Sequence, residues 1–205
     1  MSILGLFRNR RSVKDYSSSE VSNKVLFEIL EATRWAPSAH NAQPWRFVVI
    51  RDPDLKRELA KAMASRWDKD MSKNGVPLEN RQSFVKISVK RFTNAPVLIV
   101  ACLTMEDMDE YLDKRRQKIE YILAVQSVAA AIENLLLAAH AEGLGSCWFC
   151  APLFCQDVVR QVLKVPHNVE PQALITLGHS DELLEPLPRK ALQEIVYQDR
   201  WGDVV

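Results

Sequence analysis

The amino-acid sequence predicts a single α+β domain. Segments with hydrophobic residues at helical spacing are interspersed with short runs rich in β-branched and aromatic residues, which indicates both kinds of secondary structure. The spacing of these segments is irregular and lacks the even βαβ rhythm of a doubly wound sheet. The chain has 205 residues, 47% hydrophobic and 26% charged, which is typical of one soluble globular domain.

The first third of the chain predicts two helices and a strand. Ser22 is suited to cap a helix whose apolar residues recur at helical spacing, and Pro37 ends that helix. Trp45–Ile50 is rich in aromatic and β-branched residues and predicts a strand. Asp52 and Pro53 open a second helix, which we expect to end at about Trp67.

The remaining elements follow from the same patterns. Residues 68–94 form the most polar region and contain a turn signal at Lys73–Gly75. Further helices are predicted at residues 79–91, 115–141 and 155–164. Further strands are predicted at residues 96–102, 146–150, 172–178 and 194–197. The helix at 115–141 is apolar on most of its circumference, so its own domain or a partner subunit must cover several of its sides.

The charge balance argues against nucleic acid and membrane as partners. The formal net charge is +1, and polar residues such as Glu120 and Glu133 interrupt the most apolar segment, residues 119–141. The N-terminus lacks the long apolar stretch and the cleavage site of a signal peptide. Four cysteines without a secretion signal indicate reduced thiols and a cytoplasmic location.

A cluster of cations lies near the N-terminus. Residues 1–14 contain four basic residues and no acidic one. The candidate phosphate-binding residues are Arg10, Arg11, Ser12 and Lys14. Guanidinium groups and a hydroxyl can together bind a dianionic phosphate through charge-assisted hydrogen bonds. Spacing alone favours a solvated charge run, so the phosphate site needs support from elsewhere in the chain.

The segment Pro37–Trp45, PSAHNAQPW, is a second candidate. It lies between a predicted helix and a predicted strand, and it carries a hydroxyl, an imidazole and two amides. Amides supply hydrogen-bond donors and acceptors together, which suits the polar edge of a planar heterocycle. Considered alone, the segment fits an ordinary turn equally well.

The sequence predicts no metal site and no redox disulfide. Cys147 and Cys150 form a CxxC pair, but a zinc ribbon needs a second pair, and a redox pair is expected at a helix N-terminus. We therefore expect the cysteines to pack in the core. The four histidines have no sequence neighbour at metal or triad spacing. The glycines of Gly143–Gly145 follow a helix, which indicates a helix C-terminal cap.

Four segments, in order along the chain, resemble the nitroreductase family of flavin enzymes. Arg10–Tyr16 resembles the family opening R-R-S-x-K/R-x-F/Y, and Pro37–Phe47 resembles P-S-x-x-N-x-Q-P-W-x-F. Ala139–Ser146 resembles the end of the long inner helix, A-x-x-x-G-L-G-S, and Pro188–Val196 resembles the tail P-R-K/R-P-L-x-E-x-V. Within the family, the chain looks most similar to the flavin-binding domain fused to the ligase of deazaflavin cofactor biosynthesis.

The resemblance implies a single domain over residues 1–205 with a nitroreductase-like fold. A central mixed, mostly antiparallel sheet would be flanked by helices, and an intertwined homodimer would bind FMN between its subunits. The resemblance implies that the phosphate and ribityl groups of FMN are bound by Arg10, Arg11, Ser12, Lys14 and Arg189. The residues expected from the partner subunit are Pro37, Ser38, Ala39 and Asn41. Cys150 and Ala151 would lie along one face of the ring.

Two positions depart from the family pattern. Many relatives have an acid-glycine pair where this chain has Cys150 and Ala151. A basic residue often precedes the tail arginine by two positions, where this chain has Leu187. The first departure bears on the electronics of the ring, and the second weakens the expected phosphate contact from the tail.

The implied activity is transfer of hydride from NADH or NADPH, through FMN, to a nitroaromatic, quinone or enone-like acceptor. The cofactor performs the chemistry in such enzymes, so no side chain is expected to act as acid, base or nucleophile. Two alternatives stay open: a reductase of a dehydro-deazaflavin precursor, and a flavin-binding module without turnover. Residues 66–94 form the expected substrate-side excursion, in which polarity and placement single out Trp67, Asp70 and Met71.

Overall fold

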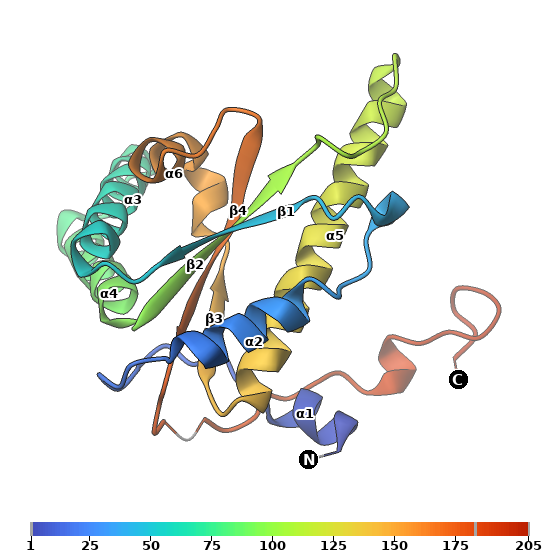
Figure 1. Ribbon diagram of the computed structural model, residues 1–205, viewed down its shortest axis with the longest axis horizontal. Helices are drawn as coiled ribbons and strands as arrows, with labels where there is room; N and C mark the ends of the chain where they lie inside the picture. Colours follow the sequence, from blue (N-terminus) through green and yellow to red (C-terminus); the bar gives the residue numbers. More distant parts are fainter. Residues whose placement is uncertain (1, 183, 205) are drawn as a thin grey trace.

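The computed structural model describes residues 2–182 and 184–204 and has an α+β fold in three layers (Figure 1). The middle layer is a four-stranded sheet in the order β1-β2-β4-β3, and each neighbouring pair is antiparallel. The strands are β1 (Trp45–Ile50), β2 (Val97–Thr104), β3 (Gly145–Phe149) and β4 (Val169–Gly178). The helices are α1 (Ile3–Asn9), α2 (Asn23–Thr33), α3 (Pro53–Lys73), α4 (Leu78–Asn94), α5 (Lys114–Ala141) and α6 (Gln156–Leu163). The short 3-10 turns are η1 (Ala39–Asn41), η2 (Ala151–Phe154) and η3 (Leu192–Glu194).

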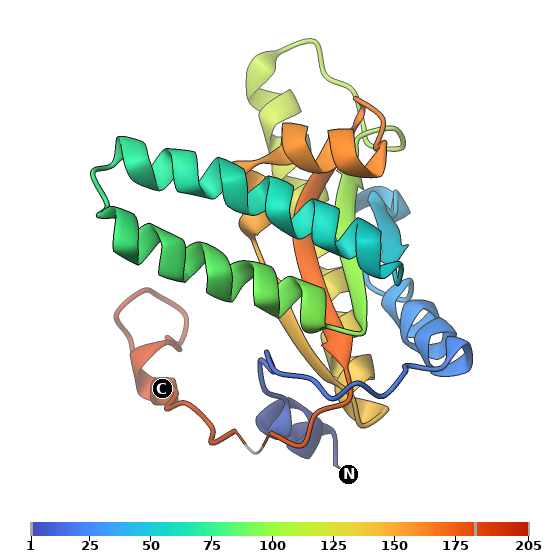
Figure 2. The ribbon, with the colours of Figure 1, turned by 90° about the vertical axis from the view of Figure 1, so that its left-hand side faces the viewer.

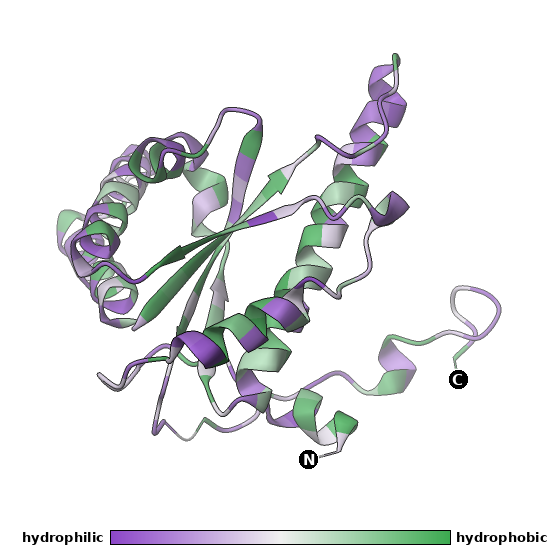
Figure 3. Ribbon diagram, viewed as in Figure 1, coloured by the Kyte–Doolittle hydropathy of each residue, from purple (hydrophilic) through white to green (hydrophobic). Residues whose placement is uncertain are grey.

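Helices cover both faces of the sheet, which explains why β2 is an unbroken apolar run. Successive side chains of a strand point to opposite faces. Ile99 and Ile175 accordingly pack against α2 and α5, whereas Val100 and Leu174 belong to the core formed with α3, α4 and α6. Figure 3 shows this apolar centre, with the most hydrophilic residues on the outer helix surfaces and the loops.

The predicted helix starts at Ser22 and Asp52 are confirmed. The Ser22 hydroxyl accepts a hydrogen bond from the Val25 amide at 3.2 Å, and the Asp52 carboxylate accepts one from the Leu55 amide at 2.7 Å. The second of these helices, α3, continues to Lys73, beyond its predicted end at Trp67. Contacts with α4, which runs antiparallel beside it, support this longer helix (Figure 2).

The long apolar segment forms α5, the central helix of one outer layer. Among the described residues it is the one helix long and apolar enough to cross a membrane by length and composition. Ala124, Ala131 and Leu135 on α5 are fully buried against α2 and the sheet. The segment therefore packs as a core helix, as its interrupting polar residues predict.

The predicted fifth strand at residues 194–197 is wrong. The mostly antiparallel sheet is confirmed: the four strands pair antiparallel, and a parallel bridge joins Ser12 to Ser146 at the edge strand β3. Leu192–Glu194 forms the 3-10 turn η3, and Tyr197 makes only an isolated bridge with Val204. After β4 the chain leaves the body of the molecule, so no strand edge lies beside residues 194–197 (Figures 1 and 2). Apolar side chains of this tail are consequently exposed, including Trp201 at 89%.

Candidate functional site

A cavity of about 670 Å³ lies between α3, α4 and the turn η2 that follows β3. Aromatic and aliphatic side chains form most of its wall. Trp67 of α3 stacks on Phe84 of α4 with 6.2 Å between ring centroids, and Phe92 meets Phe149 edge to face at 5.1 Å. Offset and edge-to-face aromatic pairs of this kind form a stable apolar wall. The cavity has the size and character of a small-molecule site.

The predicted substrate-side residues lie together at this cavity. Trp67, Asp70 and Met71 all contribute to its lining, because they face α4 along the C-terminal half of α3. Met71 is buried and Asp70 is half-buried, while Trp67 is 44% exposed. The three therefore extend from the inner wall of the cavity to its mouth.

Two arginines also line the cavity, and their electrostatic environments differ. Arg66 forms an ion pair with Asp157 at 2.5 Å, and its hydrogen bond lowers the pKa of that carboxyl group. Arg91 of α4 has no ion-pair partner among residues 2–182 and 184–204, and its guanidinium lies 5.6 Å from the ring centroid of Phe149. Arg91 thus brings an uncompensated positive charge to a largely apolar wall.

The N-terminal basic segment lies along the edge strand β3. The Val13 amide donates to the Ser146 carbonyl at 3.0 Å, and Ser12 forms a parallel bridge with Ser146. This approach requires glycine at position 145, because a Cβ there would lie 2.7 Å from Cγ1 of Val13. Gly145 therefore has a packing role in addition to following the helix cap, which the sequence pattern alone did not indicate.

Tyr16 fixes the end of the basic segment on the sheet. Its hydroxyl donates to the Val13 carbonyl at 2.6 Å. A tyrosine hydroxyl has a single proton, so in the second 2.6 Å contact the Thr176 hydroxyl donates to Tyr16. Burial raises the pKa of Tyr16, although the hydrogen bond with Thr176 opposes this effect. The phenol therefore stays neutral and keeps both bonds.

Two cations of the basic segment and one of α4 act on the thiol of Cys147 in β3. Burial raises the pKa of the Cys147 thiol, and the positive charges of Lys14, Arg91 and Arg10 act in the opposite direction. Neither Arg10 nor Lys14 has a side-chain hydrogen bond or an ion pair within the described part of the chain. The strand β3 therefore lies between the two features: its Ser146 pairs with the basic segment and its Phe149 lines the cavity, whereas Arg10 and Lys14 are not among the lining residues.

Arg11 differs from its neighbours in the basic segment. Its guanidinium donates to the carbonyls of Leu184 at 3.1 Å, Arg8 at 2.6 Å and Arg10 at 2.9 Å. Arg11 thereby ties the start of the C-terminal tail to the N-terminal segment. Arg189, further along that tail, is exposed.

The turn at residues 37–41 lies on the opposite face of the sheet from the cavity (Figure 1). The Ala39 amide donates to the Ser127 hydroxyl of α5 at 3.1 Å, and the Ser38 hydroxyl accepts from the Gln43 amide at 3.1 Å. Pro37 and Asn41 are exposed, while Ser38 and Ala39 are half-buried. A single chain therefore does not bring this turn to the cavity.

The segment after β3 begins the turn η2. Ala151 lines the cavity, whereas Cys150, immediately before it, is exposed. The prediction that the cysteines pack in the core is wrong for Cys150 and holds for Cys102, Cys147 and Cys155, which are buried. All four thiols are free, so the CxxC pair of Cys147 and Cys150 forms no disulfide in the structure.

Several cavity residues were not singled out from the sequence. Arg91, Phe84 and Phe149 lie in segments whose pattern indicates only a helix or a strand. The polarity of residues 68–94 indicated that this region lies on the substrate side. Polarity alone could not identify which face of α4 turns toward the cavity, because that depends on how α4 packs on α3.

The fold and site define an α+β protein with a cofactor-sized cavity beside an antiparallel sheet. The model of the Nitroreductase family matches residues 7–179, and the chain belongs to this family of oxidoreductases. It is 29% identical over 180 residues to a candidate NADH dehydrogenase/NAD(P)H nitroreductase of Archaeoglobus fulgidus, which covers 86% of this chain and 84% of that protein.

Two solved structures have the same fold. A BluB-like flavoprotein from Clostridium difficile 630 has a TM-score of 0.81 and 26% identity, covering 98% of this chain and 100% of that chain. A nitroreductase-type protein from Desulfovibrio desulfuricans, solved in complex with FMN, has a TM-score of 0.72 and 27% identity over 98% of each chain.

The burial pattern predicts that one thiol reacts quickly. Burial raises the pKa of Cys102 to about 12 and that of Cys155 to about 11, so little thiolate forms there at pH 8, and the thiolate is the reactive species. A thiol-specific chromogenic disulfide at pH 8 should modify Cys150 of the flavin-free protein first. Cys150→Ser should remove the fast phase, and a fast phase retained in that variant would contradict the assigned exposure.

Proposed function

We propose that this protein is an FMN-dependent oxidoreductase that transfers hydride from NADH or NADPH to a small nitroaromatic, quinone or enone-like acceptor. The observation that carries the proposal is the position of the basic segment along β3, beside an aromatic cavity of about 670 Å³ that Arg91 and Phe149 help to line. The FMN complex of the Desulfovibrio relative and the name of the Archaeoglobus relative support the choice of cofactor and reductant.

The residues present fit such a cofactor at both of its ends. A phosphate dianion needs cations and hydrogen-bond donors, and the basic segment offers two cations without ion-pair partners among the described residues. A planar ring needs an apolar slot, which the edge-to-face pair of Phe92 and Phe149 beside Ala151 offers. Bound FMN would supply the hydride chemistry, so the chain itself needs no nucleophile or general base.

We assign the phosphate and ribityl contacts to Arg10, Arg11, Ser12, Lys14 and Arg189. Within this set Arg10 and Lys14 are the direct phosphate ligands. Arg11, whose guanidinium already binds three backbone carbonyls, acts partly by holding the tail that carries Arg189. The tail is extended and exposed, which suits an arm that completes the site of another subunit.

The functional unit in this proposal is a homodimer. Pro37, Ser38, Ala39 and Asn41 lie on the face of the sheet opposite the cavity, so they can reach the cofactor only from a partner subunit. Large exposed apolar side chains support such an interface, because isolated subunits rarely expose so many. They lie on α2, in the turn after it, on α5 and in the tail: Phe27, Trp35, Ile119, Ile122, Leu187, Ile195 and Trp201.

Cys150 and Ala151 are proposed to lie along one face of the ring, with Arg91 near its electron-accepting part. Ala151 and Arg91 line the same cavity. A positive charge beside the ring stabilises the negative charge that the ring gains on reduction. In this proposal Arg91 of α4 places a positive charge near the ring. Cys150 adds no negative charge there, unlike the acidic residue that many relatives have at its position.

The acceptor is proposed to bind between α3 and α4, against Trp67, Asp70 and Met71. The stacked Trp67 and Phe84 favour a flat, apolar molecule. A dehydro-deazaflavin precursor is the alternative acceptor, and a flavin-binding module without turnover is the alternative of another class. We propose a cytoplasmic location on the basis of the free thiols.

The proposal predicts that the purified protein is yellow and that mass spectrometry identifies FMN. Under anaerobic conditions NADH or NADPH should bleach the flavin absorbance, and addition of a quinone or nitroaromatic should restore it. A colourless protein that does not bind added FMN would refute the function. Bound FMN that no nicotinamide reduces would favour the non-catalytic module, and rapid reoxidation only by the deazaflavin precursor would favour that alternative.

Lys14→Ala should weaken FMN binding by about 1.5–3 kcal/mol, roughly 10- to 150-fold, because it removes a charge-assisted phosphate contact. Arg8→Ala is the matched control, since Arg8 is an exposed cation of the neighbouring helix α1 and lies outside the proposed ligand set. Quenching of FMN fluorescence measures both affinities. Equal losses in the two variants would indicate a general charge effect and would count against the phosphate assignment.

Arg91→Ala should make the two-electron reduction potential of bound FMN more negative by about 20–60 mV. This range corresponds to about 1–3 kcal/mol for one lost charge interaction, at 30 mV per 1.4 kcal/mol. Arg91→Lys should keep most of the effect, because it retains the charge. Anaerobic titration against a reference dye measures the potential, and an unchanged value in Arg91→Ala would place the residue outside the electrostatic reach of the ring.

A further inference from the structure

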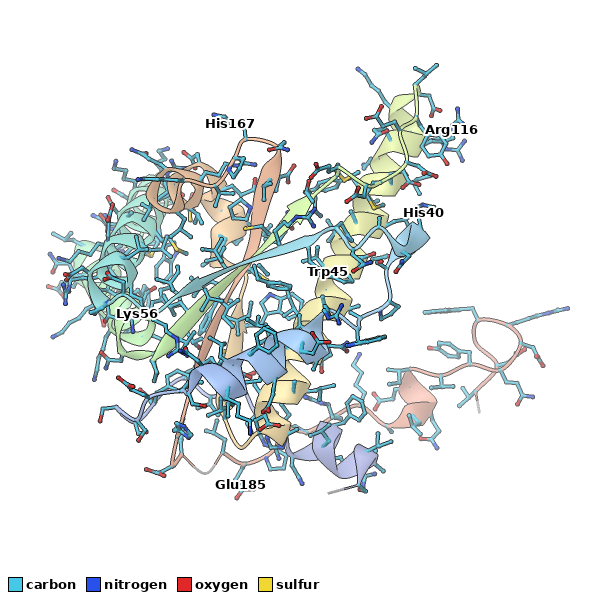
Figure 4. The ribbon with its side chains drawn as sticks, in the orientation of Figure 1. His40, Trp45, Lys56, Arg116, His167 and Glu185 are labelled. Atoms are coloured by element: carbon cyan, nitrogen blue, oxygen red, sulfur yellow. The ribbon has the colours of Figure 1, made fainter. Side chains whose placement is uncertain are left out.

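Three potential metal ligands that are distant in sequence meet beside α5, on the face of the sheet away from the cavity. His40 belongs to η1, Asp109 to the connection between β2 and α5, and Glu120 to the first half of α5. One ligand atom from each lies within 4.8 Å of the other two. Figure 4 labels His40 on the η1 turn, next to α5.

The distances between these atoms approach those of a metal site. His40 Nε2 lies 3.3 Å from Glu120 Oε2 and 3.9 Å from Asp109 Oδ2. Bonds of about 2.0–2.2 Å from a tetrahedral Zn²⁺ place neighbouring ligand atoms roughly 3.3 Å apart. The first pair already meets this value. The Asp109 side chain is 57% exposed, so it can move the remaining distance at little cost.

Glu120 is the member of the cluster that most requires a cation. Its side chain is 5% exposed, and Oε2 is buried without a hydrogen-bond partner in the described structure. A buried carboxylate oxygen without a partner is costly, because it has lost its hydration and gained nothing in exchange. Within 4 Å, His40 is the basic group that faces it in the described chain, and an imidazole is a cation only when protonated.

The local structure holds the histidine in position. His40 has φ 55° and ψ 11°, the left-handed conformation that non-glycine residues seldom adopt. The adjacent Ala39 amide is bonded to Ser127 of α5, so the turn is fixed to the helix that carries Glu120. The connection that carries Asp109 also contains Glu106, Asp107 and Glu110. Arg46 pairs with Glu106 at 3.6 Å and with Asp107 at 3.8 Å, so Glu110 is the neighbouring carboxylate that adds to the attraction of a cation.

We propose that His40, Asp109 and Glu120 bind one divalent transition-metal cation, with Zn²⁺ as the best chemical match. One imidazole and two carboxylates suit Zn²⁺, whereas Mg²⁺ and Ca²⁺ prefer ligand sets made entirely of oxygen. Water completes the coordination, because only three protein ligands are present. The ion joins the η1 turn, the β2–α5 connection and α5. This inference requires no bound flavin and stands independently of the proposed activity.

The full-length protein, with any affinity tag removed and after dialysis against a chelator, is titrated with ZnCl₂ in competition with a chromophoric zinc indicator. We expect one site per chain and at least tenfold weaker binding in Glu120→Gln and His40→Asn. Asparagine is chosen because it tolerates positive φ better than most residues. His167→Asn, which changes an exposed histidine outside the cluster, is the matched control and should bind as the parent does.

Two further measurements keep the proposal testable if a variant unfolds. Asp109→Asn alters an exposed side chain and should fold normally, yet bind Zn²⁺ more weakly. The spectrum of the Co²⁺-loaded protein should show nitrogen and oxygen ligands without thiolate charge transfer, which excludes Cys150 as the binding site. Zn²⁺ should also raise the thermal midpoint of the parent and not that of Glu120→Gln. Failure to bind Zn²⁺, or equal affinity in the parent and in Asp109→Asn and Glu120→Gln, would overturn the site and leave only a side-chain contact between His40 and Glu120.

Discussion

The candidate site depends on how closely the N-terminal segment lies against β3. The absence of a side chain at Gly145 lets Val13 pack on the strand, and the bond from the Val13 amide to Ser146 fixes the alignment. Tyr16 secures the other end of the segment through Val13 and Thr176. This alignment places the basic segment beside β3, and the Arg91 guanidinium of α4 lies over the ring of Phe149 in the same strand. A shift of this segment would move Arg10 and Lys14 away from β3.

The same architecture divides the predicted cofactor contacts between two faces of the sheet. The cavity lies on the face covered by α3, α4 and α6, whereas the turn at residues 37–41 packs on α5. An exposed apolar tail extends from the end of β4. In the homodimer that we propose, a second copy of the chain would cover the apolar surface and supply the missing contacts. The exposed tail also explains why the strand predicted at residues 194–197 does not form in a single chain.

The proposed metal cluster would act on the turn that the homodimer proposal assigns to the partner's cofactor. His40 lies between Ala39 and Asn41, and its backbone is held in an uncommon conformation. A cation bound to His40 and Glu120 would stabilise that conformation and relieve the buried carboxylate. Zn²⁺ binding at the turn would then affect FMN binding at the shared site. The two affinities can still be measured separately.

The sequence by itself determined the fold class, the helix caps at Ser22 and Asp52, and the buried strands, because these follow from periodicity and from hydrogen bonds within a few residues. Local charge and polarity identified the basic segment and the excursion that carries Trp67, and the resemblance to a known family indicated what the basic segment binds. Only the tertiary structure showed that Arg91 faces the cavity, that Cys150 is exposed, and that His40 meets Glu120 across 80 positions of sequence. Such contacts depend on the packing of distant elements, and local sequence patterns do not encode which side chains that packing brings together.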